Sequence, residues 1–522
     1  MQPLPLLGLA VLALTPAPLV AQAGCVIDSI AQPATETSLL STFGAGLAQR
    51  PGFLFASSPS ETNRLFSFNG GVATWSLLEV IQGPPSALQP SNLNFGACLA
   101  VAGSRLAVGA PYSSLLGLPN GVTFVYEQDG AGLLQPIALL APPPGSPAVR
   151  FGAATAIDES LPATLYYVGA PGDSFSEGEA FVYQVDFVGH ALIATLAASA
   201  PTPQQRFGSS LAALAGRLLV GAPGPASTPG SVYVFETSAG GVPVQRLFPS
   251  VLTPGQGFGE ALAAEGDRLL VGAPADFVGV GGGYVFERDA AGQYLEAAHL
   301  APQLPRWLDA AEFGTRVALR GDIAVLRGRT SAAAGLRPVI AVFEQIGGAW
   351  RQQKLITAGD LGFMPVDNLI GDVLLGDDRV IFATKDIGLQ KRRLVEYRLP
   401  GAVRDLGGGV AGQTAPELVV EGCLAAATNV VTRVVGGPPN GLGLFVAGRT
   451  TVDVPLYGGQ LHAGPIYLIV QAHALDAMGE YEVQAPISAA AAGQSFTVQA
   501  GYFDPFAPQG VALTNALELT VR

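Results

Sequence analysis

One short phrase occurs four times in the first half of the chain, at intervals of about fifty residues. Each copy begins with Phe-Gly and later reaches Val-Gly-Ala-Pro. The Phe-Gly pairs stand at 95–96, 151–152, 207–208 and 258–259, and the Val-Gly-Ala-Pro segments at 108–111, 168–171, 220–223 and 271–274. A fixed phrase at a fixed period indicates stacked copies of one small structural unit. This region is therefore predicted to be a repeat protein.

Weaker copies extend the series in both directions. Phe43-Gly44 precedes the four clear copies, and Phe313-Gly314 and Gly362-Phe363 follow them. Each unit contains four short apolar runs between Gly/Pro turns, which in the fourth unit are 210–214, 217–220, 231–235 and 242–248. Four-stranded units arranged around an axis form a propeller. We therefore predict a seven-bladed β-propeller over residues 24–403, within an all-β fold.

The two ends of the series predict how the ring closes. No fourth run follows Leu399, because the chain continues into Gly407-Gly408-Gly409. Val26–Ile30, however, precedes Ala31-Gln32-Pro33 as Pro136–Leu140 precedes Ala141-Pro142. We expect the N-terminal strand to be the outer strand of the last blade, which would pair an otherwise open edge.

The repeated phrase resembles the FG-GAP repeat, the blade unit of integrin-α-type β-propellers. The resemblance covers residues 25–399 and implies extracellular recognition. Propellers of that kind bind calcium in Asp-x-Asp-x-Asp-Gly loops between the first and second strands, where several oxygen ligands surround the ion. The corresponding turns here are as short as Ala215-Gly216 and Gly266-Asp267, and the longer segment with Asp158-Glu159-Ser160 lacks the alternating carboxylates. We expect no calcium and no other cofactor.

The first residues have the pattern of a secretory signal. Leu4–Val20 is apolar and Ala21-Gln22-Ala23 provides small residues for cleavage, so residues 1–23 are predicted to be a signal peptide. The protein would then be secreted, or lie at the cell surface or in the periplasm. An alternative takes Cys25 as a lipoprotein anchor, although Gln22 stands where such sites usually carry Leu.

Beyond the repeats, different strands appear. Short alternating runs at 417–421, 443–446, 466–472, 495–501 and 517–521 predict a small antiparallel β-sandwich over residues 404–522. The sequence leaves open whether this module is an anchor, a binding module or a spacer.

Three cysteines are present. Cys98 lies where sister repeats carry Ala154 and Ser210, so we expect a small buried side chain. Cys25 and Cys423 lie where the chain would pass between the propeller and the C-terminal module, and they can form a disulfide in an oxidising compartment. Cys25 can also be lipidated or free.

Charge and composition exclude several classes of partner. The net charge is −13, and no basic cluster occurs. Nucleic acid is therefore excluded as a partner. No apolar segment after residue 23 is long enough to span a membrane, and we expect a monomer.

The residues do not form a recognisable catalytic motif. The four histidines are scattered, His190 and His299 fall on fourth strands, and no Gly-x-Ser-x-Gly occurs. We therefore expect no enzyme activity. Arg320-Gly321-Asp322 resembles an integrin-binding tripeptide. We interpret it as a tight turn, equivalent to Glu265-Gly266-Asp267 and Ile370-Gly371-Asp372.

Loops are the expected place for a binding site, because they vary on a rigid scaffold. The loops from second to third strands and the connections between blades should emerge on one face. Their candidate ligand-contacting residues are Tyr112, Asp173, Phe175, Asp276, Phe277 and Trp307. The alternative is that these side chains cap the blades. The predicted function is a secreted, non-catalytic scaffold for recognition or adhesion, with a protein or glycan ligand. A structural component of an extracellular assembly and a hydrolase of extracellular polymers are the alternatives.

Overall fold

The structure is a computed structural model. It describes residues 26–31, 33, 42–59, 63–71, 74–83, 94–113, 120–172, 177–186, 189–237, 241–275, 280–304, 310–330, 336–361, 365–366, 371–376, 379–386, 391–399, 403–407, 416–422, 429–456, 459–486 and 494–520. The chain divides into two compact units. Val26–Ala358 with Phe363–Arg398 form the first, and the described residues from Leu399 onward belong to the second.

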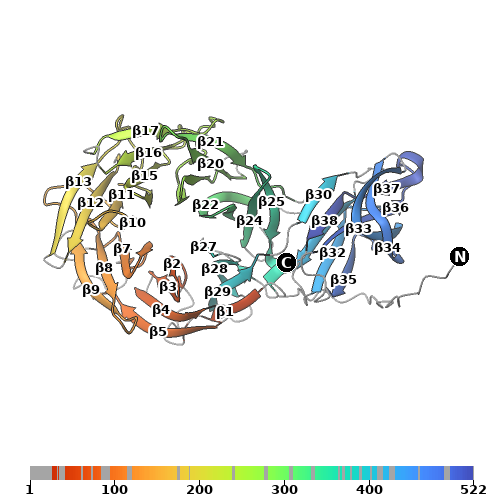
Figure 1. Ribbon diagram of the computed structural model, residues 1–522, viewed down its shortest axis with the longest axis horizontal. Coiled ribbons are helices and arrows are strands. Elements are labelled where there is room, and N and C mark those ends of the chain that lie inside the picture. Colours follow the sequence, from red (N-terminus) through yellow and green to blue (C-terminus); the bar gives the residue numbers. More distant parts are fainter. Residues whose placement is uncertain are drawn as a thin grey trace. The chain divides into compact units, whose positions relative to one another are not determined.

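The first unit is the predicted β-propeller, in which seven antiparallel sheets follow one another around an axis (Figure 1). Six sheets contain four strands in chain order. They are β2(Leu47–Arg50), β3(Phe53–Ser58), β4(Arg64–Gly71), β5(Thr74–Gln82); β6(Leu99–Ala102), β7(Arg105–Ala110), β8(Val122–Gln128), β9(Leu134–Leu140); β10(Ala154–Asp158), β11(Leu165–Ala170), β12(Glu179–Asp186), β13(Gly189–Leu196); β14(Ser210–Leu214), β15(Arg217–Ala222), β16(Ser231–Glu236), β17(Pro243–Leu247); β18(Ala261–Glu265), β19(Arg268–Ala273), β20(Gly282–Arg288), β21(Tyr294–Leu300); and β22(Ala310–Arg320), β23(Ile323–Thr330), β24(Arg337–Ile346), β25(Ala349–Ile356).

The seventh sheet confirms the predicted closure of the ring. It consists of β26(Pro365–Val366), β27(Val373–Leu375), β28(Arg379–Asp386), β29(Lys391–Arg398) and β1(Val26–Ala31). β1 pairs with β29 in antiparallel register, with Ile30 opposite Leu394. The side chain of Ile30 packs against the cluster that contains Leu394 and Phe43 of the first blade. The N-terminal strand therefore pairs the edge that the end of the repeat series leaves open.

The glycines of the repeated phrase are explained by close contact between neighbouring blades. Gly152 has a positive φ of 89°, which favours glycine, and its N–H donates to the carbonyl of Gly169 at 3.0 Å. A Cβ atom on Gly109 of the preceding blade would overlap the carbonyl oxygen of Gly152. The pairs Gly169–Gly208, Gly221–Gly259 and Gly272–Gly314 repeat this relationship. Both glycines of the phrase are thus required where the blades pack.

The phenylalanine of the phrase fills the space between blades. Phe151 is fully buried and contacts Phe181 in a tilted arrangement, at 5.3 Å between ring centroids. It also belongs to a cluster that includes Val125 and Leu140 of the preceding blade. Each Phe therefore joins two blades at a repeated position, which is why the phrase recurs.

The last blade departs from the sequence interpretation. Gly362–Met364 lie outside the described residues. Gly371 and Asp372 directly precede the first strand, β27, whereas we had expected Ile370-Gly371-Asp372 to be the turn that follows it. That prediction is wrong, because the turn between β27 and β28 begins at Gly376. The Gly-Asp pair alone does not specify a turn position.

The second unit is the predicted antiparallel sandwich, with longer strands than expected. One sheet contains β30(Val403–Gly407), β38(Ala516–Thr520), β36(Ser495–Phe503), β33(Leu442–Leu456), β34(Gly459–Ala474) and β37(Val511–Leu513); the other contains β31(Glu417–Gly422), β32(Asn429–Val435) and β35(Tyr481–Pro486). Phe445, Tyr502 and Leu418 meet in its core. Val403, expected in the propeller, already pairs with Leu519 of this unit.

Candidate binding cleft

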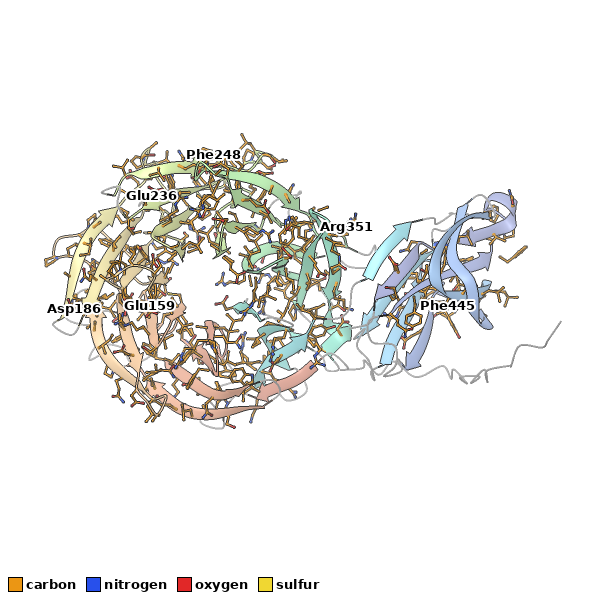
Figure 2. All side chains as sticks on the ribbon, in the orientation of Figure 1. Glu159, Asp186, Glu236, Phe248, Arg351 and Phe445 are labelled. Carbon is orange, nitrogen blue, oxygen red and sulfur yellow. The ribbon has the colours of Figure 1, made fainter. Side chains whose placement is uncertain are left out.

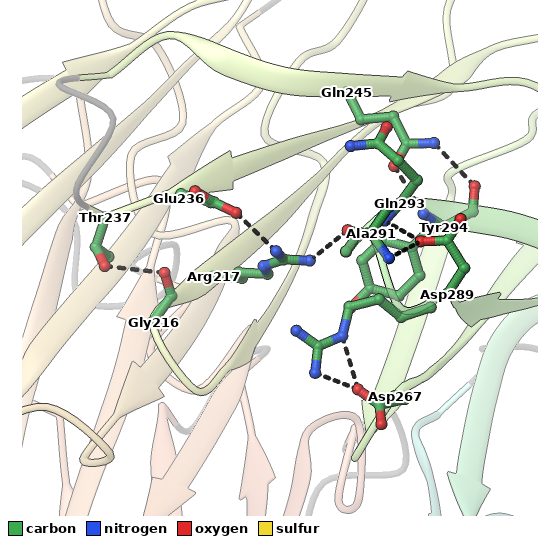
Figure 3. A network of polar contacts seen from close by, with 12 residues as sticks. Gly216, Arg217, Glu236, Thr237, Gln245, Asp267, Asp289, Ala291, Gln293 and Tyr294 are labelled. Carbon is green, nitrogen blue, oxygen red and sulfur yellow. Dashed lines mark hydrogen bonds and ion pairs between the residues drawn. The ribbon is translucent and has the colours of Figure 1, made fainter.

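An arginine at the start of the second strand joins several blades to the next. Arg217 of β15 donates to Glu236 at 2.6 Å within its own blade and to the carbonyl of Gly292 in the following blade at 2.7 Å (Figure 3). Asp289 supports that acceptor, because its carboxylate accepts the N–H groups of Ala291 and Gln293 at 2.9 Å. Arg217 therefore joins the fourth blade to the fifth through hydrogen bonds.

Arg268 repeats the arrangement one blade further on. Its guanidinium bonds Glu287 at 3.1 Å, the carbonyl of Gly321 at 2.9 Å and Asp322 at 2.6 Å. Gly321, with a φ of 54°, and Asp322 form the turn between β22 and β23. The Arg320-Gly321-Asp322 tripeptide is therefore the tight turn that the sequence interpretation predicted, and its aspartate in addition bonds the neighbouring blade.

Arg105 occupies the same position in the second blade, but the interface there is open. Its Nε lies 3.5 Å from Glu127, and one terminal nitrogen lies 4.0 Å from Glu159 and bonds Thr164 of the third blade. Beside it is a cleft with a volume of about 580 Å³. The cleft is lined by Arg105, Glu127, Ile137, Pro162, Ala163, Thr164, Gln184, Val185, Asp186 and Gly189.

The cleft exists because the third blade has a longer connection between its first two strands. The fourth blade joins β14 to β15 with Ala215 and Gly216 alone, whereas residues 159–164 separate β10 from β11. Asp158 holds this loop, since its Oδ1 accepts the N–H of Ser160 at 2.9 Å and its Oδ2 accepts the N–H of Gly216 at 2.8 Å. The loop is thus tied to both its own blade and the next one.

Hydrogen-bond donors and acceptors both line the cleft. Arg105, Gln184 and Thr164 can donate, while Glu127 and Asp186 accept. Figure 2 shows Glu159 and Asp186 in the same sector of the ring, with Glu159 nearer the axis. The two lining carboxylates outnumber the single guanidinium, so the cleft favours neutral or cationic ligands over anions. Ile137 and Val185 form the apolar part of the cleft wall.

A buried hydroxyl near these charges has no hydrogen-bond partner. Tyr166 of β11 is 1 % exposed, and its hydroxyl is unpaired within the described part of the chain. Burial raises the pKa of Tyr166 well above its usual value, and the charges of Arg105, Glu159 and Glu127 also influence this pKa. An unpaired buried hydroxyl costs free energy and is unusual in a packed interface. Tyr167 of the same strand also has an unpaired buried hydroxyl within the described residues, so this feature is not specific to the cleft.

Most residues predicted to contact a ligand lie outside the described residues. These are Asp173, Phe175, Asp276, Phe277 and Trp307. Tyr112 is described, is 52 % exposed and lies 5.8 Å from the guanidinium of Arg150. The cleft lies at the other ends of the strands, beside the turns that join first to second and third to fourth strands. The sequence showed the longer segment with Asp158-Glu159-Ser160, but we considered that segment only as a possible calcium loop.

The cysteine and the two histidines of the propeller that the sequence singled out contact neighbouring residues of the fold. Cys98 precedes β6 and is half-buried, not fully buried as expected, and its thiol donates to the carbonyl of Gly152 at 3.2 Å. His299 stacks on Tyr284 at 4.1 Å between centroids, and the His190 ring lies 6.3 Å from that of Tyr183. Cys25 and Cys423 lie outside the described residues, as does the predicted signal peptide.

No group of three or more His, Cys, Asp or Glu side chains within the described residues is arranged to hold a metal ion. Nor does this part of the chain contain a helix with the length and hydropathy that crossing a membrane requires.

Comparisons with known proteins add the following. No protein-family model matches the chain, and no curated protein matches its sequence. Among solved structures, a chain of a mitotic checkpoint complex is 10 % identical, covers 75 % of this chain and 99 % of its own length, and superposes with a TM-score of 0.44. Sqt1 from Chaetomium thermophilum is 14 % identical, covers 68 % of this chain and 82 % of its own length, and has a TM-score of 0.37. These likenesses are too distant to bear on function.

Proposed function

We propose that the protein is a secreted, non-catalytic propeller that recognises an extracellular ligand, and that the ligand binds in the cleft between the second and third blades. The observation that carries this proposal is the contrast between equivalent interfaces. Arg105, Arg217 and Arg268 each bond a group of the next blade, but Arg105 also borders a cleft of about 580 Å³. In a repeat scaffold, a unit that departs from the common packing is a natural place for function.

The chemistry of the cleft favours a glycan. Sugar hydroxyl groups both donate and accept, which suits a surface that presents a guanidinium, an amide, a hydroxyl and two carboxylates. Neutral sugars also tolerate the excess of carboxylates over cations. A protein ligand would most readily insert a Lys or Arg side chain between Glu127 and Asp186. Because that alternative uses only part of the donor set, we favour the glycan.

Several parts of the proposal rest on the sequence. The apolar stretch before Ala21-Gln22-Ala23 supports export, and the Phe-Gly and Val-Gly-Ala-Pro phrases support kinship with FG-GAP propellers. Non-catalytic action is supported by the environment of the lining carboxylates. Glu127 interacts with Ser104 and Arg105, and Asp186 accepts the N–H of Gly189 at 3.1 Å.

A carbohydrate array tests this function. The mature chain, residues 24–522, would be applied beside Ala163→Trp, which fills the cleft without removing an inter-blade hydrogen bond. Ala291→Trp, at an exposed turn of the fifth blade, is the matched control. We expect binding to a small group of glycans, lost in Ala163→Trp and retained in Ala291→Trp. Absence of glycan binding, or binding unaffected by Ala163→Trp, would contradict the proposal.

A further inference from the structure

The C-terminal module exposes large apolar side chains on one end of a sheet. Leu442 and Leu444 of β33 are 69 % and 48 % exposed, and Phe503 at the end of β36 is 65 % exposed. Phe506, in the loop that follows, is 71 % exposed. We call these four residues the apolar end. Large exposed apolar groups gathered in one place mark interaction surfaces in soluble proteins.

Strand register places three of these side chains on the same face. Leu444 lies opposite Gly501 and Gly443 lies opposite Tyr502, so Leu442 and Phe503 come next along the two paired strands. Phe445 and Tyr502 point into the core, and residues on a strand alternate between faces. Leu442, Leu444 and Phe503 therefore lie on the outer face, where alternation would normally place polar residues.

The loop that carries Phe506 is held in a fixed conformation. The carboxylate of Asp504 is buried and accepts the N–H of Phe506 at 2.9 Å. The N–H of Asp504 donates to the carbonyl of Gly510 at 3.1 Å, which closes the loop. A structured loop that exposes a phenylalanine keeps that ring available for contact, at a small entropic cost when a partner binds.

The exposed charged side chains beside Met478 and the apolar end are acidic. Of the acidic residues in segments 436–448, 474–482 and 494–513, Glu482 pairs with Arg433 at 3.0 Å and Asp504 is buried, which leaves Asp476 and Glu480. Asp476 and Glu480 are exposed and flank Met478, which is 77 % exposed. A second copy of this chain would bring like charges together, and an anionic bilayer would be repelled. The complementary occupant is apolar with basic flanks.

We propose that the apolar end is a docking surface for a partner protein that presents a short apolar segment flanked by Lys or Arg. This contact is independent of the glycan cleft on the propeller. With both sites in use, the chain would connect a basic partner at its C-terminal module to a glycan at its propeller.

Selection from a random peptide library tests the partner chemistry. The mature chain would be the bait, and a Phe503→Gln/Phe506→Gln double variant would be the counter-bait. We expect enriched peptides to combine Leu, Phe or Trp with flanking Lys or Arg. Their affinity, measured by fluorescence anisotropy, should fall at least tenfold in the double variant and further as salt is raised. Enrichment of acidic or uncharged peptides would overturn the proposal, as would enrichment of no class.

A control and two competing occupants complete the test. Leu252→Gln removes an equally exposed apolar side chain, at 63 %, from the propeller and should leave peptide affinity within twofold of the wild-type value. Sedimentation that shows a dimer, abolished in the double variant, would assign the surface to a second copy instead. Binding of neutral phosphatidylcholine vesicles, lost in the double variant, would assign it to a membrane. Unchanged thermal unfolding of the variants verifies that they fold.

Discussion

The carbonyl oxygen of Gly152 occupies the space in which a Cβ atom on Gly109 would lie. Because the same contact recurs at successive blade interfaces, it fixes how closely the blades approach one another. Gly109→Ala should therefore force the second and third blades apart and lower the free energy of unfolding by about 1–3 kcal/mol. Urea denaturation of the mature chain would measure this loss.

A second alanine substitution serves as the control for that prediction. Nothing lies within 4 Å of a Cβ atom on Gly130, which is in an exposed turn of the same blade. Gly130→Ala should leave the unfolding midpoint nearly unchanged. Equal losses for the two variants would mean that blade contact is not the reason for the repeated glycine.

Arg327 replaces the inter-blade glycine between the sixth and seventh blades. It is fully buried, and its guanidinium donates to the carbonyls of Asp372 at 2.9 Å and Ala383 at 2.7 Å. Arg327→Ala should cost roughly 2–5 kcal/mol, because it leaves a cavity and two buried acceptors without this donor. Arg351→Ala removes an exposed arginine from the same blade and should have little effect in the same denaturation experiment.

Closure of the ring depends on β1. Ile30 is half-buried between the last and first blades, so Ile30→Asp should place an unpaired charge there and cost about 1–3 kcal/mol. We also expect aggregation on heating, because β29 would present an open edge. Differential scanning calorimetry with size-exclusion chromatography measures both effects, and Val242→Asp, at an exposed site, is the comparison. A wild-type thermogram for Ile30→Asp would contradict the closure role.

The thiol of Cys98, a half-buried residue, predicts that the stability of the protein depends on pH. Burial raises the pKa of Cys98 from 9.0 to about 11. The folded state thus retains the thiol proton to higher pH than the unfolded chain, and this contribution to stability is complete below pH 9 and declines as the pH rises toward 11. The stability difference between wild type and Cys98→Ser should shift against the wild type between pH 8 and 10.5. A difference that is constant over this range would contradict the raised pKa.

Reactivity provides a second measurement on the same group. In a Cys25→Ser/Cys423→Ser background, Cys98 should react with a disulfide reagent at pH 8 roughly 100-fold more slowly in the folded protein than in denaturant, because only the thiolate is nucleophilic. Comparable rates in the two states would show that the thiol is accessible and that its pKa is not raised in the folded protein.

Much of the propeller could be predicted from the sequence because the residues that pack its blades together recur in every clear repeat. The Phe-Gly and Val-Gly-Ala-Pro phrases specify fully buried rings and blade contacts that recur with a constant period. The fourth-strand pattern at Val26–Ile30 likewise identified β1. The last blade was harder, since its Gly371-Asp372 pair precedes a strand whereas similar pairs elsewhere form turns.

The C-terminal module and the cleft were less predictable for physical reasons. β32 and β35 belong to no repeat, so no second copy supports their prediction. β33 and β34 contain 15 and 16 residues, whereas the predicted runs within them were only 443–446 and 466–472. The cleft depends on the departure of residues 159–164 from the common turn and on Arg105 having a different environment from Arg217. Such differences appear only when the blades are placed side by side.

Hydrogen exchange in the presence of the glycan that binds most strongly on the array would locate the ligand on the intact mature chain. We expect slower exchange at residues 159–164 and 184–186 and around Arg105, with Ala163→Trp abolishing the change. Protection confined to the opposite ends of the strands, around Tyr112 and Arg150, or to the C-terminal module, would contradict binding in the cleft.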